Sequence, residues 1–376
     1  MIATWYKMTV IPSAQIIEQI SRFAAEHIAS RHDLSEMEDF PHDLWEKMAQ
    51  AGLFKIGIDE FYGGSGGGYL NLTEAAEALV KNGHNMGIAT SWVYQQIVAR
   101  FLIAGFGSEE QKHKLLPEMA LGKLTVSFAV SEPQHGAHPK YITTAAVKEK
   151  LFYILNGEKT YLTNGPIAGL FIVIAVTEEG QQKKFTAFLV PRHAAGLKVG
   201  LPLKLNFLKP SPHGSIVLNN CRLPDTAILG KEGTAYREMV IAFGEVEEIV
   251  MMGATAGAMA AQLSLLIRAT GEDKIVSTNL LKDKLGVQDA ALQTIRTIAY
   301  SAAKSLDQGE ALSVSQAITF MNLTAEFQTN MDAIIQKWNL HVDACYNCLR
   351  TDLTSVMALK NKITQMWQKK LRLGGY

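Results

Sequence analysis

Cysteine is scarce in this chain of 376 residues, which contains only Cys221, Cys345 and Cys348. A small and odd number of thiols argues against a disulfide scaffold and favours a reducing compartment, so we expect a cytoplasmic protein. Cys345 and Cys348 form a single CxxC, and a zinc ribbon would need a second cysteine pair, which the sequence lacks. We favour two cysteines on neighbouring turns of a helix over a redox pair.

An excess of charge is also missing, because 36 basic residues balance 36 acidic ones. A nucleic-acid binder needs a basic face for the phosphates, so we expect no nucleic-acid partner. The N-terminus shows no secretory signal. One uncharged segment, residues 249–267, is long enough to cross a bilayer. Its Ala, Gly and Met content also suits a helix packed on all sides, and we predict a buried core helix and no membrane segment.

Three regions of different texture divide the chain. Residues 1–122 and 233–376 show apolar residues at helical spacing, whereas residues 123–232 carry short β-rich runs between turn signals such as Asn156-Gly157. The pattern predicts an α+β multidomain fold with an N-terminal helical domain, a small β-barrel or sandwich, and a C-terminal four-helix bundle. The four helices expected in that bundle are 235–269, 277–307, 313–347 and 351–372.

The segment 63–68 (GGSGGG) invites comparison with a phosphate-binding loop. No Gly-Lys-Ser/Thr follows it, and its spacing does not give GxGxxG. We therefore predict a turn between two helices.

Five short segments carry a family resemblance. They are 58–64 (IDEFYGG), 107–112 (GSEEQK), 128–133 (FAVSEP), 156–165 (NGEKTYLTNG) and 223–233 (LPDTAILGKEG). In the same order they resemble IPEEYGG, GTEEQK, FALTEP, NGxKxWITNG and VPxxxxLGxxG of the acyl-CoA dehydrogenase family of flavoproteins. The resemblance extends over nearly the whole chain and implies the helical–β–helical fold of that family, with FAD as the cofactor.

A flavin needs an aromatic or apolar wall against its ring and fixed donors along its polar edge. The resemblance implies that Ser131 bonds the polar edge, Thr163 lies near the flavin N5, and Tyr161 covers the ring in place of the usual Trp. Plain β-strands with exposed hydroxyls are the alternative. The FAD contacts implied in this region are Phe128, Val130, Ser131, Gly136, Tyr161 and Thr163.

The adenine end of FAD is implied to lie partly against a neighbouring subunit. Arg268 matches the arginine of the family's RxxFG, where it can pair with the pyrophosphate. Asn279 takes the place of a family Gln, and Gly374 and Gly375 fall on the family's QILGGYG. The resemblance implies that these four residues also contact FAD.

Acyl-CoA dehydrogenation removes a proton α to a thioester, which requires a carboxylate in a dry, apolar pocket. Where the family places this base on a core helix, it is the Glu of LDxER, and Glu247 aligns with it. The arginine that follows is replaced by Glu248, and Glu245 completes an acidic cluster. Two interpretations stay open: Glu247 is the catalytic base, or the cluster is a solvated helix N-terminus favoured by the helix dipole.

The loop after Pro133 contains His135 and His138, and Ala137 replaces a family Ser. The two histidines and Glu132 could suggest a metal pair, but the loop spacing and the lack of a third convincing ligand argue against it. We expect no metal, and uncharged histidines near an anionic cofactor.

The resemblance thus implies an FAD-dependent acyl-CoA or acyl-thioester dehydrogenase of fatty acid metabolism, with Glu247 abstracting the α-proton. Its expected partners are an acyl-CoA or acyl-carrier-protein thioester, an electron-transfer flavoprotein or another acceptor, and further copies of the chain in a homodimer or homotetramer. Two alternatives remain. One is a flavin-dependent monooxygenase or oxidase on the same fold, and the other is a catalytically inactive homologue that binds acyl thioesters or a partner.

Overall fold

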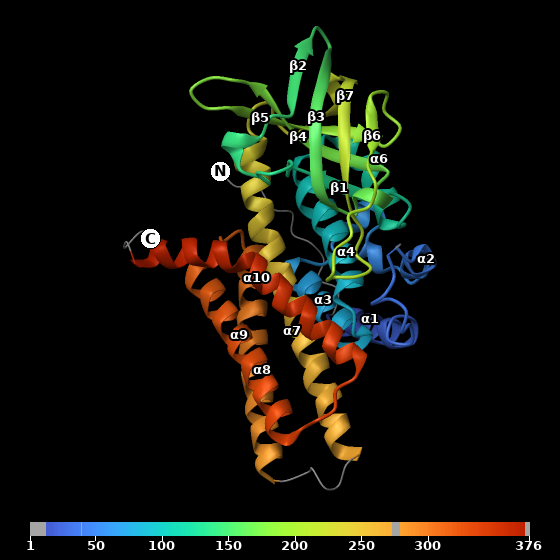
Figure 1. The fold of residues 1–376 in the computed structure, drawn as a ribbon. Coiled ribbons are helices and arrows are strands. Elements are labelled where there is room, and N and C mark those ends of the chain that lie inside the picture. The colour runs from blue at the N-terminus through green and yellow to red at the C-terminus, as the bar shows by residue number, and fades with distance from the viewer. Residues whose placement is uncertain (1–12, 39, 273–278, 373–376) are drawn as a thin grey trace.

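The computed structural model describes residues 13–38, 40–272 and 279–372, and its elements fall into three parts along the chain (Figure 1). Helices come first, an eight-stranded sheet follows, and long helices close the chain. The predicted helical–β–helical fold is confirmed. The domain limits at 122/123 and 232/233 stay predictions.

The N-terminal helices bury one face each. In α1, the buried Ile16, Ile20 and Phe23 recur every three or four residues, which places them on one side of the helix. Ser108 and Gln111 form a capping box at the start of α6. The helices of this part are α1 (Ser13–His27), α2 (His42–Gln50), η1 (Leu53–Lys55), η2 (Glu60–Tyr62), α3 (Tyr69–Gly83), α4 (Met86–Ile97), the π-helix η3 (Val98–Ile103), α5 (Ala104–Phe106) and α6 (Glu109–Ala120).

The β-domain is one continuous sheet with the strand order β6-β7-β3-β2-β4-β5-β8, and β1 pairs in parallel with β4. Buried side chains of β3, β4, β5 and β7 form a hydrophobic cluster separate from the main core, so the sheet curls around them in the manner of a barrel. The strands are β1 (Val126–Ala129), β2 (Ala145–Glu149), β3 (Phe152–Thr163), β4 (Leu170–Glu178), β5 (Lys184–Pro191), β6 (Leu197–Val199), β7 (His213–Pro224) and β8 (Ile228–Leu229).

Four long helices form the C-terminal part. They are α7 (Ala242–Glu272), which continues the π-helix η7 (Tyr236–Ile241), then α8 (Asn279–Asp307), α9 (Val314–Trp338) and α10 (Ala344–Arg372). The predicted boundary between the last two helices is wrong. The break falls at Asn339, which adopts the left-handed conformation with φ 47° and ends α9, rather than near residue 350.

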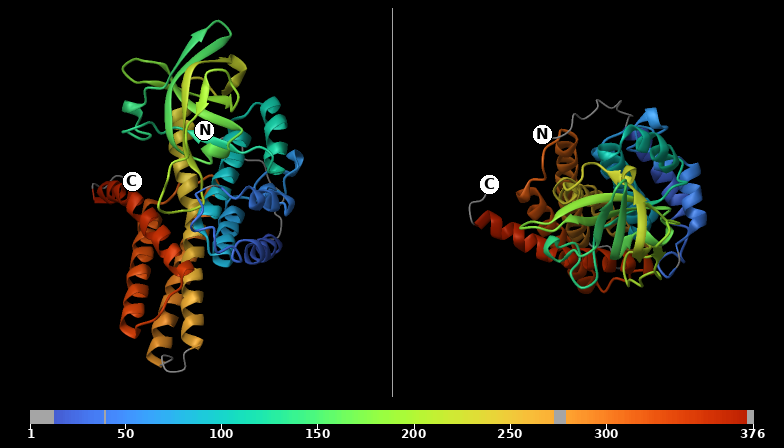
Figure 2. Two further views of the ribbon diagram at one scale, coloured as in Figure 1. Left: turned by 45° about the vertical axis from the view of Figure 1, so that its right-hand side comes forward. Right: turned by 90° about the horizontal axis from the view of Figure 1, so that it is seen from above.

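The apolar helix α7 runs through the centre of the molecule, with the N-terminal helices along one side and α8 to α10 along the other (Figure 2). Among the described residues, the continuous helix of η7 and α7 is the one that is long and apolar enough to span a membrane. Of its most apolar 18-residue stretch, 89% is buried inside the protein. Gly253 and Gly257 let α3 approach closely, because a Cβ on Gly253 would lie 2.0 Å from the carbonyl oxygen of Thr73. The prediction of a buried core helix is confirmed.

Charged residues join the N-terminal helices to the bundle. The carboxylate of Asp307, the last residue of α8, accepts hydrogen bonds from the backbone N–H groups of Tyr69 (2.7 Å) and Leu70 (3.0 Å) at the start of α3. A carboxylate there satisfies N–H groups that have no partner within the helix. The glycine-rich segment 63–68 is the turn that precedes this helix, as predicted.

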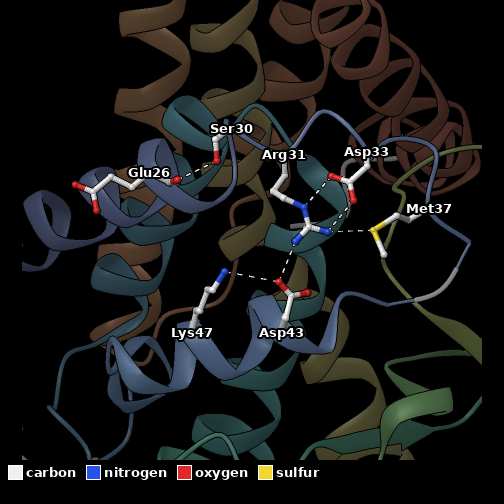
Figure 3. Close-up of polar contacts among 7 residues, drawn as sticks. All are labelled: Glu26, Ser30, Arg31, Asp33, Met37, Asp43 and Lys47. Carbon is white, nitrogen blue, oxygen red and sulfur yellow. Dashed lines mark hydrogen bonds and ion pairs between the residues drawn. The ribbon is translucent and has the colours of Figure 1, made fainter.

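Arg31 fixes the loop between α1 and α2 (Figure 3). Its guanidinium makes two hydrogen bonds of 2.7 Å to Asp33 and one of 3.0 Å to Asp43. We expect Arg31→Ala to lower the free energy of unfolding by about 1 kcal/mol, because the bonds are partly exposed. Arg31→Lys keeps the charge but loses the forked geometry, so it should restore little. Urea denaturation of both variants measures the difference, and equal stability of all three proteins would contradict the expectation.

Candidate active site

Two segments of the sheet, predicted as the flavin contacts, lie side by side. The Ser127 hydroxyl donates a 2.8 Å hydrogen bond to the carbonyl oxygen of Thr163, and the backbone N–H of Thr160 donates one of 2.9 Å to the carbonyl oxygen of Ser131. Residues 127–131 and the motif 156–165 are therefore joined at both ends of the edge that they share. This edge faces the helical part of the protein.

Side chains of helix α4 hydrogen-bond to the backbone of this edge. The Gln95 amide donates to the carbonyl oxygen of Leu124 (2.8 Å) and accepts from the backbone N–H of Val126 (3.0 Å). The Tyr94 hydroxyl donates to the carbonyl oxygen of Phe128 (3.3 Å). Side chains of one helix thus fix the register of β1 relative to the N-terminal helices.

A buried ion pair holds the same two segments from the other side. Lys159 Nζ lies 2.9 Å from the Glu132 carboxylate and donates to the carbonyl oxygen of Val130 (3.0 Å). The carboxylate also accepts from the backbone N–H and hydroxyl groups of Thr143 and Thr144, at 2.6–2.9 Å. All the polar atoms that this pair brings into the interior have hydrogen-bond partners, as a buried pair requires.

The pKa values of this pair reflect its burial and its mutual attraction. Burial alone would raise the pKa of Glu132, but the charge of Lys159 and the bonds from Thr144 and Thr143 hold it at about 2. Burial lowers the pKa of Lys159 to about 8, against the opposing effect of Glu132. Both groups are therefore charged at neutral pH.

The predicted ring contacts differ in exposure in a way that fits a flat, amphipathic cofactor. Phe128 and Val130 are buried, Ser131 and Thr163 are half-buried, and the Tyr161 side chain is 62% exposed. Tyr161 also has a φ of 57° at an irregularity in the β3–β7 pairing, a strained conformation for a bulky residue. An exposed aromatic side chain on the same pair of segments as two half-buried hydroxyl residues fits the wall and the polar edge that a flavin ring needs.

Gly136 and His213 complete the surroundings of this edge. Gly136 has a φ of 60°, and no atom lies within 4 Å of where a Cβ would be. A ligand such as FAD can therefore come close to the backbone at this turn. His213 Nδ1 lies 3.1 Å from the carbonyl oxygen of Ser211 and so carries a proton. Its Nε2 then accepts the hydrogen bond from the Thr163 hydroxyl, 3.3 Å away. Burial lowers the pKa of His213, which keeps the ring neutral.

Glu247 lies half-buried on α7, four residues after Phe243. The Phe243 ring packs 4.9 Å from the Phe128 ring and 5.3 Å from the Tyr94 ring. Burial raises the pKa of Tyr94 well above its ordinary value, and the negative charge of Glu247 raises it further. The face of α7 that bears Glu247 is therefore turned toward α4 and β1.

The acidic cluster does not lie at a helix N-terminus. The π-helix η7 runs without a break into α7, so Glu247 is about three helical turns from the first residue of η7, beyond the reach of the helix dipole. Glu245 is exposed, whereas Glu248 is buried. The interpretation of a solvated helix N-terminus is wrong in this respect.

The residues predicted at the adenine end are not brought to this edge within one chain. Arg268 lies near the end of α7 and Asn279 begins α8, and both are exposed at the tip of the bundle, opposite the sheet (Figure 1). Glu247 and Arg268 are separated by about 30 Å of helix. Gly374 and Gly375 lie outside the described residues.

The two loop histidines and the CxxC cysteines singled out in the sequence lie in surroundings that explain them without a metal or redox role. The rings of His135 and His138 lie 4.5 Å and 5.0 Å from the Tyr141 ring. Cys345 and Cys348 occupy the first turns of α10, and burial raises the pKa of Cys345 and brings that of Cys348 to about 12. Protonated thiols are poor nucleophiles, which argues against a redox pair.

Asp352 of α10 ties the C-terminal part to the loop before His213. Its carboxylate is 1% exposed and accepts a 2.6 Å hydrogen bond from the backbone N–H of Leu208. Burial raises the pKa of Asp352 from 3.8 to about 7, although the bond from Leu208 opposes this. The nearby Cys348 thiol has its own pKa raised by burial first and then by the charge of Asp352.

The raised pKa of Asp352 predicts a pH dependence of stability. Because the folded state holds this proton more tightly than the unfolded state, the contribution is fully present below pH 3.8 and is lost as the pH rises toward 7. We expect the stability of the wild type relative to Asp352→Asn to fall by on the order of 1 kcal/mol per pH unit in this window. Urea denaturation of both proteins at several pH values measures this difference, and parallel slopes would contradict the assignment.

Sequence reasoning missed the supporting residues. Lys159 and Glu132 stand in two matched motifs 27 positions apart, and only the strand pairing reveals that they form an ion pair. Tyr94 gives a weak signal as a polar residue in an apolar helix, and Phe243 gives none before Glu247 is placed beside it.

Known proteins resemble this chain over most of its length. The models for the N-terminal and middle domains of acyl-CoA dehydrogenase match residues 13–123 and 127–221. Mitochondrial isovaleryl-CoA dehydrogenase of Pongo abelii is 28% identical over 310 residues, 78% of this chain and 72% of the relative. The L-prolyl-[peptidyl-carrier protein] dehydrogenase of Pseudomonas fluorescens is 27% identical over 330 residues, 84% of this chain and 83% of the relative.

Solved structures share the fold. A glutaryl-CoA dehydrogenase from Mycobacterium smegmatis, solved in complex with FADH2, superposes with a TM-score of 0.83 at 21% identity and covers 96% of this chain and 94% of its own. The family resemblance and its cofactor are thereby confirmed. The chain belongs to the acyl-CoA dehydrogenase family, the FAD-dependent oxidoreductases that act on the CH–CH group of acyl thioesters.

Proposed function

We propose that this protein dehydrogenates an acyl thioester between its α and β carbons, with Glu247 as the base. The observation that supports this most directly is the position of Glu247. It lies on the face of α7 that packs against Tyr94 and Phe128, next to the strands predicted to hold the flavin ring. A half-buried carboxylate beside buried aromatic rings is less exposed to water than one on the surface, and this suits a base that removes a proton from carbon.

Each part of the site has a task in this reaction. FAD, when bound, would supply the acceptor for the β-hydrogen, which leaves as a hydride. Glu247 would accept the α-proton. Tyr161 would cover the ring, Ser131 would bond its polar edge, and Thr163 would lie near the flavin N5. Phe128 and Val130 would close the site to water. The Glu132–Lys159 pair keeps these contacts in register.

The carrier of the acyl group and the acceptor that reoxidises the flavin are part of the same proposal. A coenzyme A ester and a peptidyl-carrier-protein thioester are both named as substrates of relatives, and the two share the same thioester chemistry. We propose an electron-transfer flavoprotein or another acceptor for reoxidation of the flavin. A homodimer or homotetramer would let Arg268 and Asn279 of one copy reach the cofactor of another. That arrangement accounts for their distance from the ring contacts within one chain.

The flavin content of the purified protein tests the first requirement. We expect a yellow protein with one FAD per chain, or one that takes up FAD after gel filtration. Tyr161→Ala should weaken FAD binding because it removes the aromatic face that stacks on the flavin ring. Tyr161→Trp supplies another aromatic face and should retain binding. A colourless wild type that does not bind added FAD would leave only the inactive-homologue alternative.

A further inference from the structure

Four buried aromatic side chains meet between α4, η3, β1 and α7. They are Tyr94, Phe101, Phe128 and Phe243, each at most 9% exposed. The Phe243 ring is central, with its centroid 4.9 Å from that of Phe128, 5.3 Å from Tyr94 and 6.4 Å from Phe101. Rings at these separations are in van der Waals contact. We refer to these four residues as the ring cluster.

The ring cluster borders the proposed base. Phe243 precedes Glu247 by one helical turn, so the two side chains share a face of α7. Tyr94 lies close enough to Glu247 to respond to its charge, and its hydroxyl is held by the carbonyl oxygen of Phe128. Glu247 therefore lies next to the ring cluster, one helical turn after Phe243 and close to Tyr94.

The direction of the substrate follows from the size of its carrier. Coenzyme A and a carrier protein are large and polar, so they must remain at the solvent side, where Ile241 of η7 and Glu245 of α7 are exposed. The acyl group must then point inward from Glu247, away from solvent. The inward side is where the ring cluster lies.

We infer that the ring cluster restricts this protein to short or compact acyl groups. The inference rests on the proposed dehydrogenation at Glu247. With the α-carbon beside Glu247, the carbons beyond the β-carbon meet Tyr94 and Phe243 directly. A long methylene chain needs a channel between packed rings, and forcing volume into a filled core is unfavourable.

Pantetheine thioesters test the inference, because this arm is common to both kinds of carrier. The rate of flavin bleaching under nitrogen is measured with the butanoyl, octanoyl and hexadecanoyl esters. We expect the wild type to prefer the butanoyl over the octanoyl ester by about 10- to 100-fold. Phe101→Ala, which shortens one wall of the ring cluster, should reduce this preference at least about tenfold.

Three further variants show whether the volume of the ring cluster, and not another property of its side chains, sets the chain-length preference. Tyr94→Phe removes the hydroxyl but keeps the ring, so the chain-length preference should persist, whereas Tyr94→Ala should relax it. Phe188→Ala removes an equally buried ring from the separate core of the β-domain and should leave the preference unchanged. A wild type that bleaches as fast with octanoyl as with butanoyl ester, or an unchanged preference in Phe101→Ala, overturns the inference.

Binding distinguishes a failure of the inference from a failure of the proposed reaction. If no ester bleaches the flavin, the dehydrogenase proposal fails, and calorimetric affinities of the same esters decide the question of size. Tighter binding of the butanoyl ester by the wild type, lost in Phe101→Ala, supports the inference. Tighter binding of the longer esters by the wild type overturns it.

Discussion

Replacing Glu247 with glutamine is expected to slow the reduction of bound FAD by an acyl thioester by about 10²- to 10⁴-fold. The amide is nearly the same size as the carboxylate, so the contact between the neighbouring Tyr94 and Phe243 rings is kept. It cannot accept the α-proton, however, and the hydride cannot leave without it. Stopped-flow measurement of flavin bleaching under nitrogen gives the rate.

Neighbouring glutamates provide the matched controls. Glu245 is exposed and Glu248 is buried on the same helix. Glu245→Gln and Glu248→Gln therefore test whether the loss of any one acidic charge slows the reduction of the flavin. We expect Glu245→Gln to bleach at nearly the wild-type rate. Bleaching of Glu247→Gln at that rate as well would show that Glu247 is not the base.

Replacing Lys159 with methionine is expected to destabilise the protein by about 3–5 kcal/mol. The change leaves the Glu132 carboxylate buried with its bonds to Thr143 and Thr144 but without a counter-charge. It also removes the hydrogen bond to Val130, so the segment that contains Ser131 loses one of its anchors. Thermal unfolding measures the stability, and fluorescence titration measures the accompanying loss of FAD affinity.

The double variant Lys159→Met with Glu132→Leu is the control for this prediction. Removing both charges should recover much of the stability, because no uncompensated charge remains. FAD affinity should stay low if the pair positions the flavin strands. Full stability of the single variant would contradict a structural role for the pair.

The same pair predicts acid sensitivity. The pKa of Glu132 is lowered from 4.5 to about 2 on folding, so its contribution to stability is present above pH 4.5. That contribution is lost as the pH falls from 4.5 to 2, because the unfolded state takes up the proton first.

Local patterns predicted the elements and the strand edge of the site. Short motifs such as NGEKTYLTNG set the turn and strand chemistry within a few residues, and the structure indeed joins this segment to FAVSEP through Thr160 and Ser131. The boundary between α9 and α10 could not be predicted, because Asn339 ends the helix without glycine or proline.

Contacts between distant segments explain the other differences. The continuity of η7 with α7 depends on packing around Met239 and Phe243, and no capping pattern marks where the helix begins. The separation of Arg268 from the ring contacts follows from the length of α7, which a motif match does not measure. Tyr94 enters the site only because α4 packs under β1.

One single-turnover experiment tests the account most directly. The FAD-loaded protein is mixed under nitrogen with one equivalent of butanoyl pantetheine, and both the flavin spectrum and the thioester are analysed. We predict loss of the visible flavin band together with conversion of the ester to its α,β-unsaturated form, which has lost two hydrogen atoms. An oxidised flavin beside an unchanged ester, or a hydroxylated product formed only after oxygen is admitted, would contradict the account.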